Sequence, residues 1–107
     1  MFISKRCDCS SKKNKCIPSG IDLQKLSNNL TLISVKSRLD LLFLLNEKPH
    51  CVCDLGEHTK LSQSLISHHL SDLTKAGFVD NKRVGKYTDY FLTLKGKALV
   101  KTLKQIA

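Results

Sequence analysis

The sequence contains no run of apolar residues long enough to cross a membrane, which takes about 20 of them in succession. Residues 1–6 also lack the apolar stretch of a secretory signal peptide. We therefore expect a cytoplasmic protein without a membrane partner, in a compartment where thiols stay reduced. A disulfide framework is disfavoured there, so the five cysteines of this 107-residue chain indicate metal binding or redox sensing.

Acidic residues are scarce. The chain has 9 Asp and Glu against 18 Lys and Arg, which gives a formal net charge of +9. A basic balance this strong favours a polyanionic partner, with nucleic acid ahead of a membrane surface. The length corresponds to one domain with a modest hydrophobic core.

Features of a thiol enzyme are missing too. The sequence has no Cys-x-x-Cys pair in a βαβ context and no glycine-rich loop that would form a pocket. These absences disfavour a thiol-dependent reductase, and we expect the protein not to be an enzyme.

Residues 1–20 contain few apolar side chains and are rich in Lys and Ser. Such a segment cannot bury enough surface to offset the entropy lost on ordering, so we predict a mobile basic arm. It carries three cysteines, Cys7, Cys9 and Cys16, which favour a ligand role over a disordered tail with incidental thiols. Residues 21–107 are predicted to form the folded domain.

Two helices are expected to open this domain. From Ile21 onward, apolar residues recur at spacings of three and four and form one stripe, which could pack on the domain's own core or on a second subunit: Leu23, Leu26, Leu30 and Ile33. Residues 35–46 are apolar almost all round, which predicts the buried centre of the core. Ser37 and Asp40 resemble a capping box for this second helix.

A helix–turn–helix follows. The first helix runs from Cys51 or Val52 to His58, and residues 59–62 form the turn. Ser62 is a suitable N-cap for a second helix that reaches Ala76, where Gly77 suits a left-handed C-cap. The predicted apolar stripe of this second helix is Leu65, Ile66, Leu70 and Leu73.

Residues 78–92 have the pattern of a two-stranded ribbon with a basic turn at residues 82–86, and Thr93 caps a last helix. The predicted fold is therefore mainly α with a β-hairpin wing, a winged helix-turn-helix. In this fold the N-terminal part of the second helix contacts base edges in the major groove. The predicted DNA-binding residues are Ser62, Gln63, Ser64, Ser67 and His68, with Lys60, Arg83 and Lys86 at phosphates or in a minor groove.

Several of these stretches resemble the ArsR/SmtB family of metal-sensing repressors. Residues 61–70, with Leu73 and residues 76–79, resemble the family's recognition helix, and residues 30–45 resemble its second-helix region. Residues 51–55, Cys-Val-Cys-Asp-Leu, match the metal-binding box of its arsenic, cadmium and lead sensors. The resemblance implies a homodimeric winged-helix repressor that leaves its operator when metal binds.

Cys51 and Cys53 would lie about 200° apart within a regular helix, but at a helix start they can share one ion. The partial positive charge of a helix start also favours the thiolate form. Two thiolates are too few, because a tetrahedral site takes four ligands. By resemblance, a trivalent arsenic centre takes three ligands, and arm cysteines join the pair across the dimer.

The arm cysteines are ranked with Cys7 and Cys9 first and Cys16 as the alternate third ligand. His50, next to Cys51, is either a nitrogen ligand or a plain loop histidine. The inducer is expected to be As(III), Sb(III), Cd(II), Pb(II) or Zn(II), with no organic cofactor. A thiol-redox regulator of the same fold and a structural zinc module are the alternatives.

Some family members also bind zinc on the C-terminal helix through His and acidic residues. Residues 94–107 contain no His, Asp, Glu or Cys, so we expect no such site.

Two departures from the family pattern affect the first helix of the helix–turn–helix. Lys60 stands where glycine is frequent and costs roughly 1–2 kcal/mol if its backbone is left-handed. Gly56 costs roughly 1 kcal/mol relative to alanine, so we expect this helix to be easily displaced.

Overall fold

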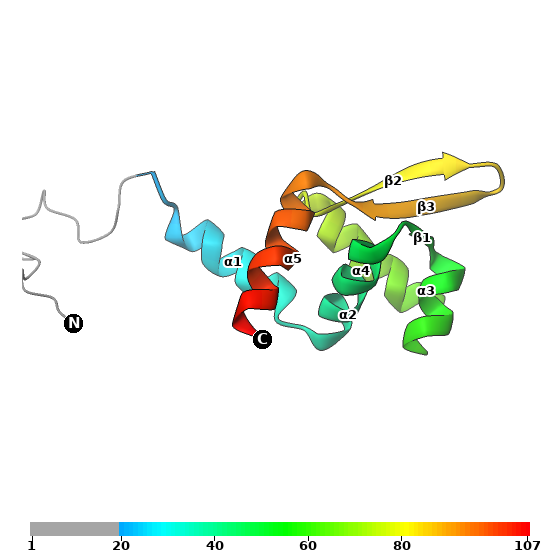
Figure 1. Ribbon diagram of the computed structural model, residues 1–107, viewed down its shortest axis with the longest axis horizontal. Coiled ribbons are helices and arrows are strands. Elements are labelled where there is room, and N and C mark those ends of the chain that lie inside the picture. Colours follow the sequence, from blue (N-terminus) through cyan, green and yellow to red (C-terminus); the bar gives the residue numbers. More distant parts are fainter. Residues whose placement is uncertain (1–19) are drawn as a thin grey trace, which may run out of the picture.

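The computed structural model describes residues 20–107. In this part of the chain five helices and a three-stranded antiparallel sheet form a winged helix-turn-helix, as predicted (Figure 1). The elements are α1 (Leu23–Ile33), α2 (Lys36–Glu47), β1 (His50–Cys51), α3 (Val52–Thr59), α4 (Gln63–Lys75), β2 (Val79–Val84), β3 (Tyr87–Leu92) and α5 (Leu94–Ile106). No helix among these residues has the length and apolar character to span a membrane. The predicted arm lies almost wholly outside the described residues.

The core gathers around α2, as its apolar composition predicts. Leu41 and Leu42 of this helix are fully buried, and α3, α5 and β3 all pack against α2. Burial of one leucine side chain stabilises the fold by roughly 1.5–3 kcal/mol. The other fully buried large side chains come from helices α3, α4 and α5 and from strand β2: Leu55, Ile66, Leu70, Leu73, Val79 and Val100. The predicted inward position of Leu65 is wrong, because this side chain is 39% exposed.

Helix α1 begins at Leu23, because the side chain of Asp22 caps it by accepting hydrogen bonds from the backbone N–H groups of Gln24 and Lys25. Only its last residue, Ile33, is buried. The other three residues of the predicted stripe are 45–52% exposed: Leu23, Leu26 and Leu30. Within this chain the stripe therefore does not pack on the core.

Capping side chains fix the ends of the later helices. Ser62 accepts a hydrogen bond from the N–H of Leu65, and Thr93 accepts one from the N–H of Gly96. Gly77 has a φ of 88° and ends α4 with the paired hydrogen bonds of a Schellman motif. The predicted capping box of α2 is wrong: Val35 is the N-cap, and Asp40 pairs instead with Lys36 at 3.0 Å.

Strand β3 lies at the centre of the sheet, between β2 and a short strand that the sequence pattern did not predict. This strand, β1, has only two residues, and it places Cys51 opposite Asp89 and His50 opposite Tyr90. The hairpin of β2 and β3 closes through Gly85, whose φ of 61° suits the first position of a two-residue turn. Because β1 pairs with β3 and α3 follows β1 directly, the start of α3 is attached to the wing.

The turn between α3 and α4 has a left-handed backbone at Lys60, with φ of 64° and ψ of 18°. Its N–H donates to the carbonyl oxygen of Gly56 at 2.9 Å, which closes the end of α3. For a residue with a side chain this conformation costs roughly 1–2 kcal/mol. The left-handed backbone on which the predicted cost at Lys60 depends is therefore present.

The two glycines inside helices predict opposite effects of alanine. A Cβ on Gly56 would meet its neighbours at 3.6 Å or more, which is ordinary contact, whereas a Cβ on Gly96 would overlap the Phe78 carbonyl oxygen. We expect Gly56→Ala to raise the free energy of unfolding by up to about 1 kcal/mol. We expect Gly96→Ala to lower it by about 2 kcal/mol or more. Urea unfolding followed by circular dichroism measures both; equal effects would contradict the close approach of α5 to Phe78.

Candidate nucleic-acid interface and thiol site

Helix α4 presents a polar surface that begins at its N-terminus. All five side chains predicted to reach base edges are exposed: Ser62, Gln63, Ser64, Ser67 and His68. Lys60 is exposed in the turn before the helix, and Arg83 and Lys86 are exposed at the end of the wing. These residues lie where a winged helix-turn-helix contacts the bases and backbone of DNA.

Arg38 of α2 ties the recognition helix to the rest of the fold. Its Nε donates to Nδ1 of His69 at 2.9 Å, and its Nη2 donates to Oδ2 of Asp72 at 2.6 Å. Its Nη1 donates to the carbonyl oxygen of Leu32 at 3.1 Å. The ion pair is largely buried, with 12% of the Arg38 side chain and 27% of the Asp72 side chain exposed. These contacts fix the rotation of α4 against α2.

His69 is buried in this network, and burial lowers its pKa below the ordinary value. The positive charges of Arg38 and His68 lower this pKa further, whereas Asp72 acts in the opposite direction. Nδ1 of His69 must stay unprotonated to accept the Arg38 hydrogen bond. The sequence pattern did not reveal this contact, because Arg38 lies 31 residues before His69 in the chain.

Both cysteines of the predicted box face one hollow of about 330 Å³ between α3 and the wing. Cys51 ends β1 and is the half-buried N-cap of α3, and Cys53 is exposed in the first turn of that helix. The other lining residues are Asp54 of α3 and three residues of the wing: Val84, Tyr87 and Asp89. The wing's share in this hollow was missed, because it depends on the pairing of β1 with β3.

Among residues 20–107 no three His, Cys, Asp or Glu side chains are placed to hold one metal ion. Cys7, Cys9 and Cys16, the other predicted ligands, lie outside the described residues. What this part of the chain contributes is a pair of thiols at the start of one helix. Thiols are the ligands that soft metal ions prefer.

His50 is not a loop residue but lies in β1, with 4% of its surface exposed. Its Nδ1 is 3.8 Å from the Asp54 carboxylate, and neither ring nitrogen has a hydrogen-bond partner among residues 20–107. Its ring packs edge-on against that of His58, with 5.4 Å between centroids. The imidazole is therefore buried in the protein and contacts the ring of His58.

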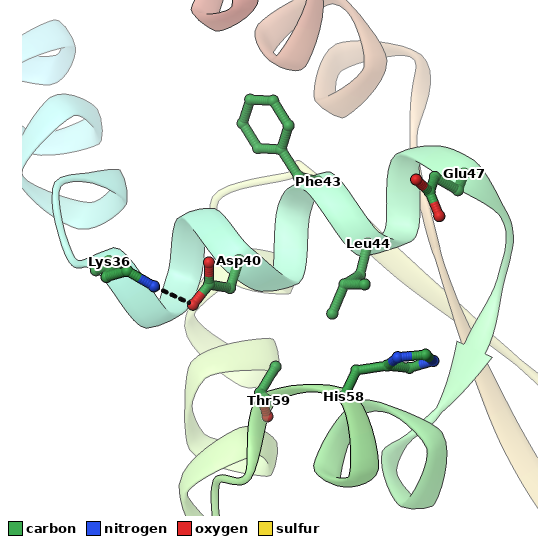
Figure 2. A pocket seen from close by; sticks show the side chains of 7 residues that line it. All are labelled: Lys36, Asp40, Phe43, Leu44, Glu47, His58 and Thr59. Carbon is green, nitrogen blue, oxygen red and sulfur yellow. Dashed lines mark hydrogen bonds and ion pairs between the residues drawn. The ribbon is translucent and has the colours of Figure 1, made fainter. Parts of the chain in front are cut away.

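A larger hollow of about 450 Å³ lies between α2 and α3 (Figure 2). Its walls combine Phe43 and Leu44 with the Lys36–Asp40 ion pair, Glu47, His58 and Thr59. None of the residues predicted to bind metal or to contact DNA lines it. We therefore place the ligand chemistry at the smaller, cysteine-lined hollow.

Gln63 links the two predicted sites. Its side-chain Nε2 donates to Sγ of Cys53 at 3.9 Å, across the turn of the helix–turn–helix. A residue predicted to contact a base is thus in contact with a residue predicted to bind metal.

Known proteins resemble the central part of this chain. Residues 36–81 match the model of a family described as bacterial regulatory protein, arsR family. The cadmium resistance transcriptional regulatory protein CadC of Listeria innocua is 33% identical over 75 residues, which are 69% of this chain and 63% of CadC. The arsenical resistance operon repressor of Staphylococcus aureus is 39% identical over 62 residues, or 58% of this chain and 60% of that repressor. The chain therefore spans less than two thirds of the length of these curated relatives.

Among solved structures, the transcriptional repressor BigR from Xylella fastidiosa has a TM-score of 0.70 and 30% sequence identity. The match covers 78% of this chain and 84% of BigR. Together with the family match, it shows that the winged helix-turn-helix prediction is confirmed and that the relatives are regulators rather than enzymes.

The lowered pKa of His69 predicts a pH-dependent stability. Above about pH 6.5 the ring is neutral in both folded and unfolded chains, so its full contribution to stability is present. As the pH falls, the unfolded chain binds the proton first, and the contribution is lost down through the lowered pKa of the folded state. We expect His69→Asn to flatten the fall in unfolding free energy between about pH 7 and pH 5. His68→Asn, at an exposed neighbouring position, is the matched control; equal slopes for wild type and His69→Asn in urea unfolding would contradict the assignment.

Proposed function

Because the chain belongs to the arsR family of bacterial regulatory proteins, we propose that it is a repressor that leaves operator DNA when its cysteines bind a thiophilic ion. The named relatives are a cadmium resistance transcriptional regulatory protein and an arsenical resistance operon repressor. The observation that carries the proposal is the hollow in which Cys51 and Cys53 meet the wing, directly before the recognition helix. The expected cytoplasmic location stays a prediction.

The DNA-binding part of the proposal rests on exposed polar and basic side chains. Helix α4 enters the major groove, where Gln63 forms a bidentate contact with an adenine. Ser62, Ser64, Ser67 and His68 contact neighbouring bases or phosphates. Lys60, Arg83 and Lys86 neutralise phosphates from the turn and the wing, in keeping with the net charge of +9.

The exposed surface of α1 supports a homodimer. Leu23, Leu26 and Leu30 expose one continuous apolar stripe on this helix, and such a stripe is stabilised when a second subunit covers it. Two-fold pairing places two recognition helices in successive major grooves, about 34 Å apart.

The inducer site joins Cys51 and Cys53 to cysteines of the arm, first Cys7 and Cys9, with Cys16 as alternate. Thiol sulfur suits As(III), Sb(III), Cd(II), Pb(II) and Zn(II). The pair together with one or two arm cysteines supplies three or four sulfur ligands. Ligation draws the arm onto the start of α3, and the altered α3 displaces the recognition helices from their groove spacing. Coupling between the sites is reciprocal, so operator DNA weakens ion binding by the same factor.

A release titration tests the proposal. A fluorescent duplex is selected from a random-sequence pool with the metal-free protein and then titrated with arsenite or cadmium under reductant. We expect release from wild type and at least about a tenfold weaker response for Cys51→Ser and Cys53→Ser, because both sulfurs are ligands.

Cys→Ser variants at positions 7, 9 and 16 then count the arm ligands. Three essential thiols indicate a trigonal site and four a tetrahedral one. Release by peroxide without metal, and no release by any of the ions under reductant, would overturn the proposal in favour of a redox regulator.

Charge placed on the α1 stripe is expected to separate the dimer. In Leu26→Glu a carboxylate would be buried without a partner, which costs several kcal/mol across a two-fold interface. Size-exclusion chromatography with light scattering should show a monomer at micromolar concentration. Asn28→Glu adds the same charge elsewhere on α1 and should remain a dimer. A monomeric wild type would contradict the homodimer.

A further inference from the structure

Gln63 occupies the boundary between the thiol site and the DNA-reading surface. It is the first residue of α4, and its amide Nε2 donates to Sγ of Cys53 at 3.9 Å. Within the described residues it is the one predicted base-contacting side chain with a hydrogen bond to a cysteine. Cys53 and Gln63 are both exposed, so neither is held there by burial.

A glutamine amide can serve the sulfur and a base together. Its terminal group has two N–H donors and one carbonyl oxygen. A bidentate contact with adenine uses the oxygen and one N–H, which leaves the second N–H for Sγ of Cys53. The sulfur can therefore fix the orientation of the amide before DNA arrives, which reduces the ordering cost of the base contact.

We propose that Gln63 couples the thiol site to base recognition, through the hydrogen bond that it donates to Cys53. This inference rests on the proposed function, since it requires Cys53 to be a ligand of the inducing ion. In the metal-free protein the sulfur holds the amide ready for adenine. When Cys53 rotates to bind the same ion as Cys51, its contact with the Gln63 amide, which is as long as 3.9 Å, is broken.

The released amide then samples several rotamers, and the base contact is weakened at one position of the operator. This route acts inside one protomer, and it adds to any change in the spacing of the two recognition helices. Because the coupling is reciprocal, a base pair that holds Gln63 also holds the Cys53 sulfur away from the ion.

Gln63→Met tests the coupling, because methionine keeps the length of the side chain and its helix propensity but removes both N–H donors. The measured quantity is the release factor, the ratio of the Kd for the selected duplex with cadmium chloride to the Kd without it. We expect Gln63→Met to weaken metal-free DNA binding roughly tenfold and to reduce the release factor at least about fivefold. An unchanged release factor would overturn the inference.

Ser64→Ala is the matched control. Ser64 is the next residue of α4 and is exposed on the predicted DNA surface, but in the described part of the chain it makes no hydrogen bond to a cysteine. Its loss should weaken DNA binding equally with and without cadmium, so its release factor should equal that of wild type. The same drop in both variants would trace the effect to weaker DNA binding and overturn the inference. If wild type shows no release, the proposed function itself fails, and the coupling role falls with it.

A second readout needs no DNA. The side-chain amide signals of Gln63 in the ¹⁵N-labelled, metal-free protein are assigned by their absence in Gln63→Met. We expect Cys53→Ala to shift these signals and Cys51→Ala to leave them in place. Cadmium added to wild type should shift them as Cys53→Ala does. Signals that stay in place upon cadmium binding would mean that the sulfur keeps its amide partner, and the inference would be wrong.

Discussion

The position of the recognition helix depends on one buried guanidinium group. Arg38 of α2 contacts His69 and Asp72 on α4 and the carbonyl oxygen of Leu32 at the end of α1. Apolar packing alone lets a helix rotate by small amounts at low cost, whereas a charged group with three directed hydrogen bonds fixes one orientation. The same Asp72 carboxylate lies 3.5 Å from Nε2 of His68, on the DNA-facing side. The reading surface is therefore fixed from inside the core.

Helix α3 buries fewer side chains than α4. It has eight residues, of which Leu55 alone is fully buried, and it contains Gly56. It ends at the left-handed Lys60, a conformation that stores free energy. The thiols thus stand on the helix with one fully buried side chain, and the residues predicted to contact bases stand on the helix that Arg38 holds. In the proposed mechanism an ion that pulls on Cys51 and Cys53 therefore moves α3 first.

The sequence predicts most of this fold because its helix ends carry local signals. Ser62, Gly77 and Thr93 mark boundaries through their own side chain or backbone, which depend little on distant residues. Strand β1 escaped prediction because two residues are too few for a pattern, and its pairing with β3 decides which wing residues reach the thiols. The Arg38–Asp72 pair spans 34 positions, so it became visible only in three dimensions.

The distance between sensing and reading is short in this protein. Cys53 and Gln63 are ten residues apart in sequence and share one hydrogen bond. Two routes therefore lead from a displaced thiol to DNA: the backbone of the turn at Lys60 and the side chain of Gln63. The first route must rotate a helix that Arg38 resists, while the second needs only a change of rotamer. In the proposed mechanism the amide is therefore the route that needs the smaller rearrangement of the fold.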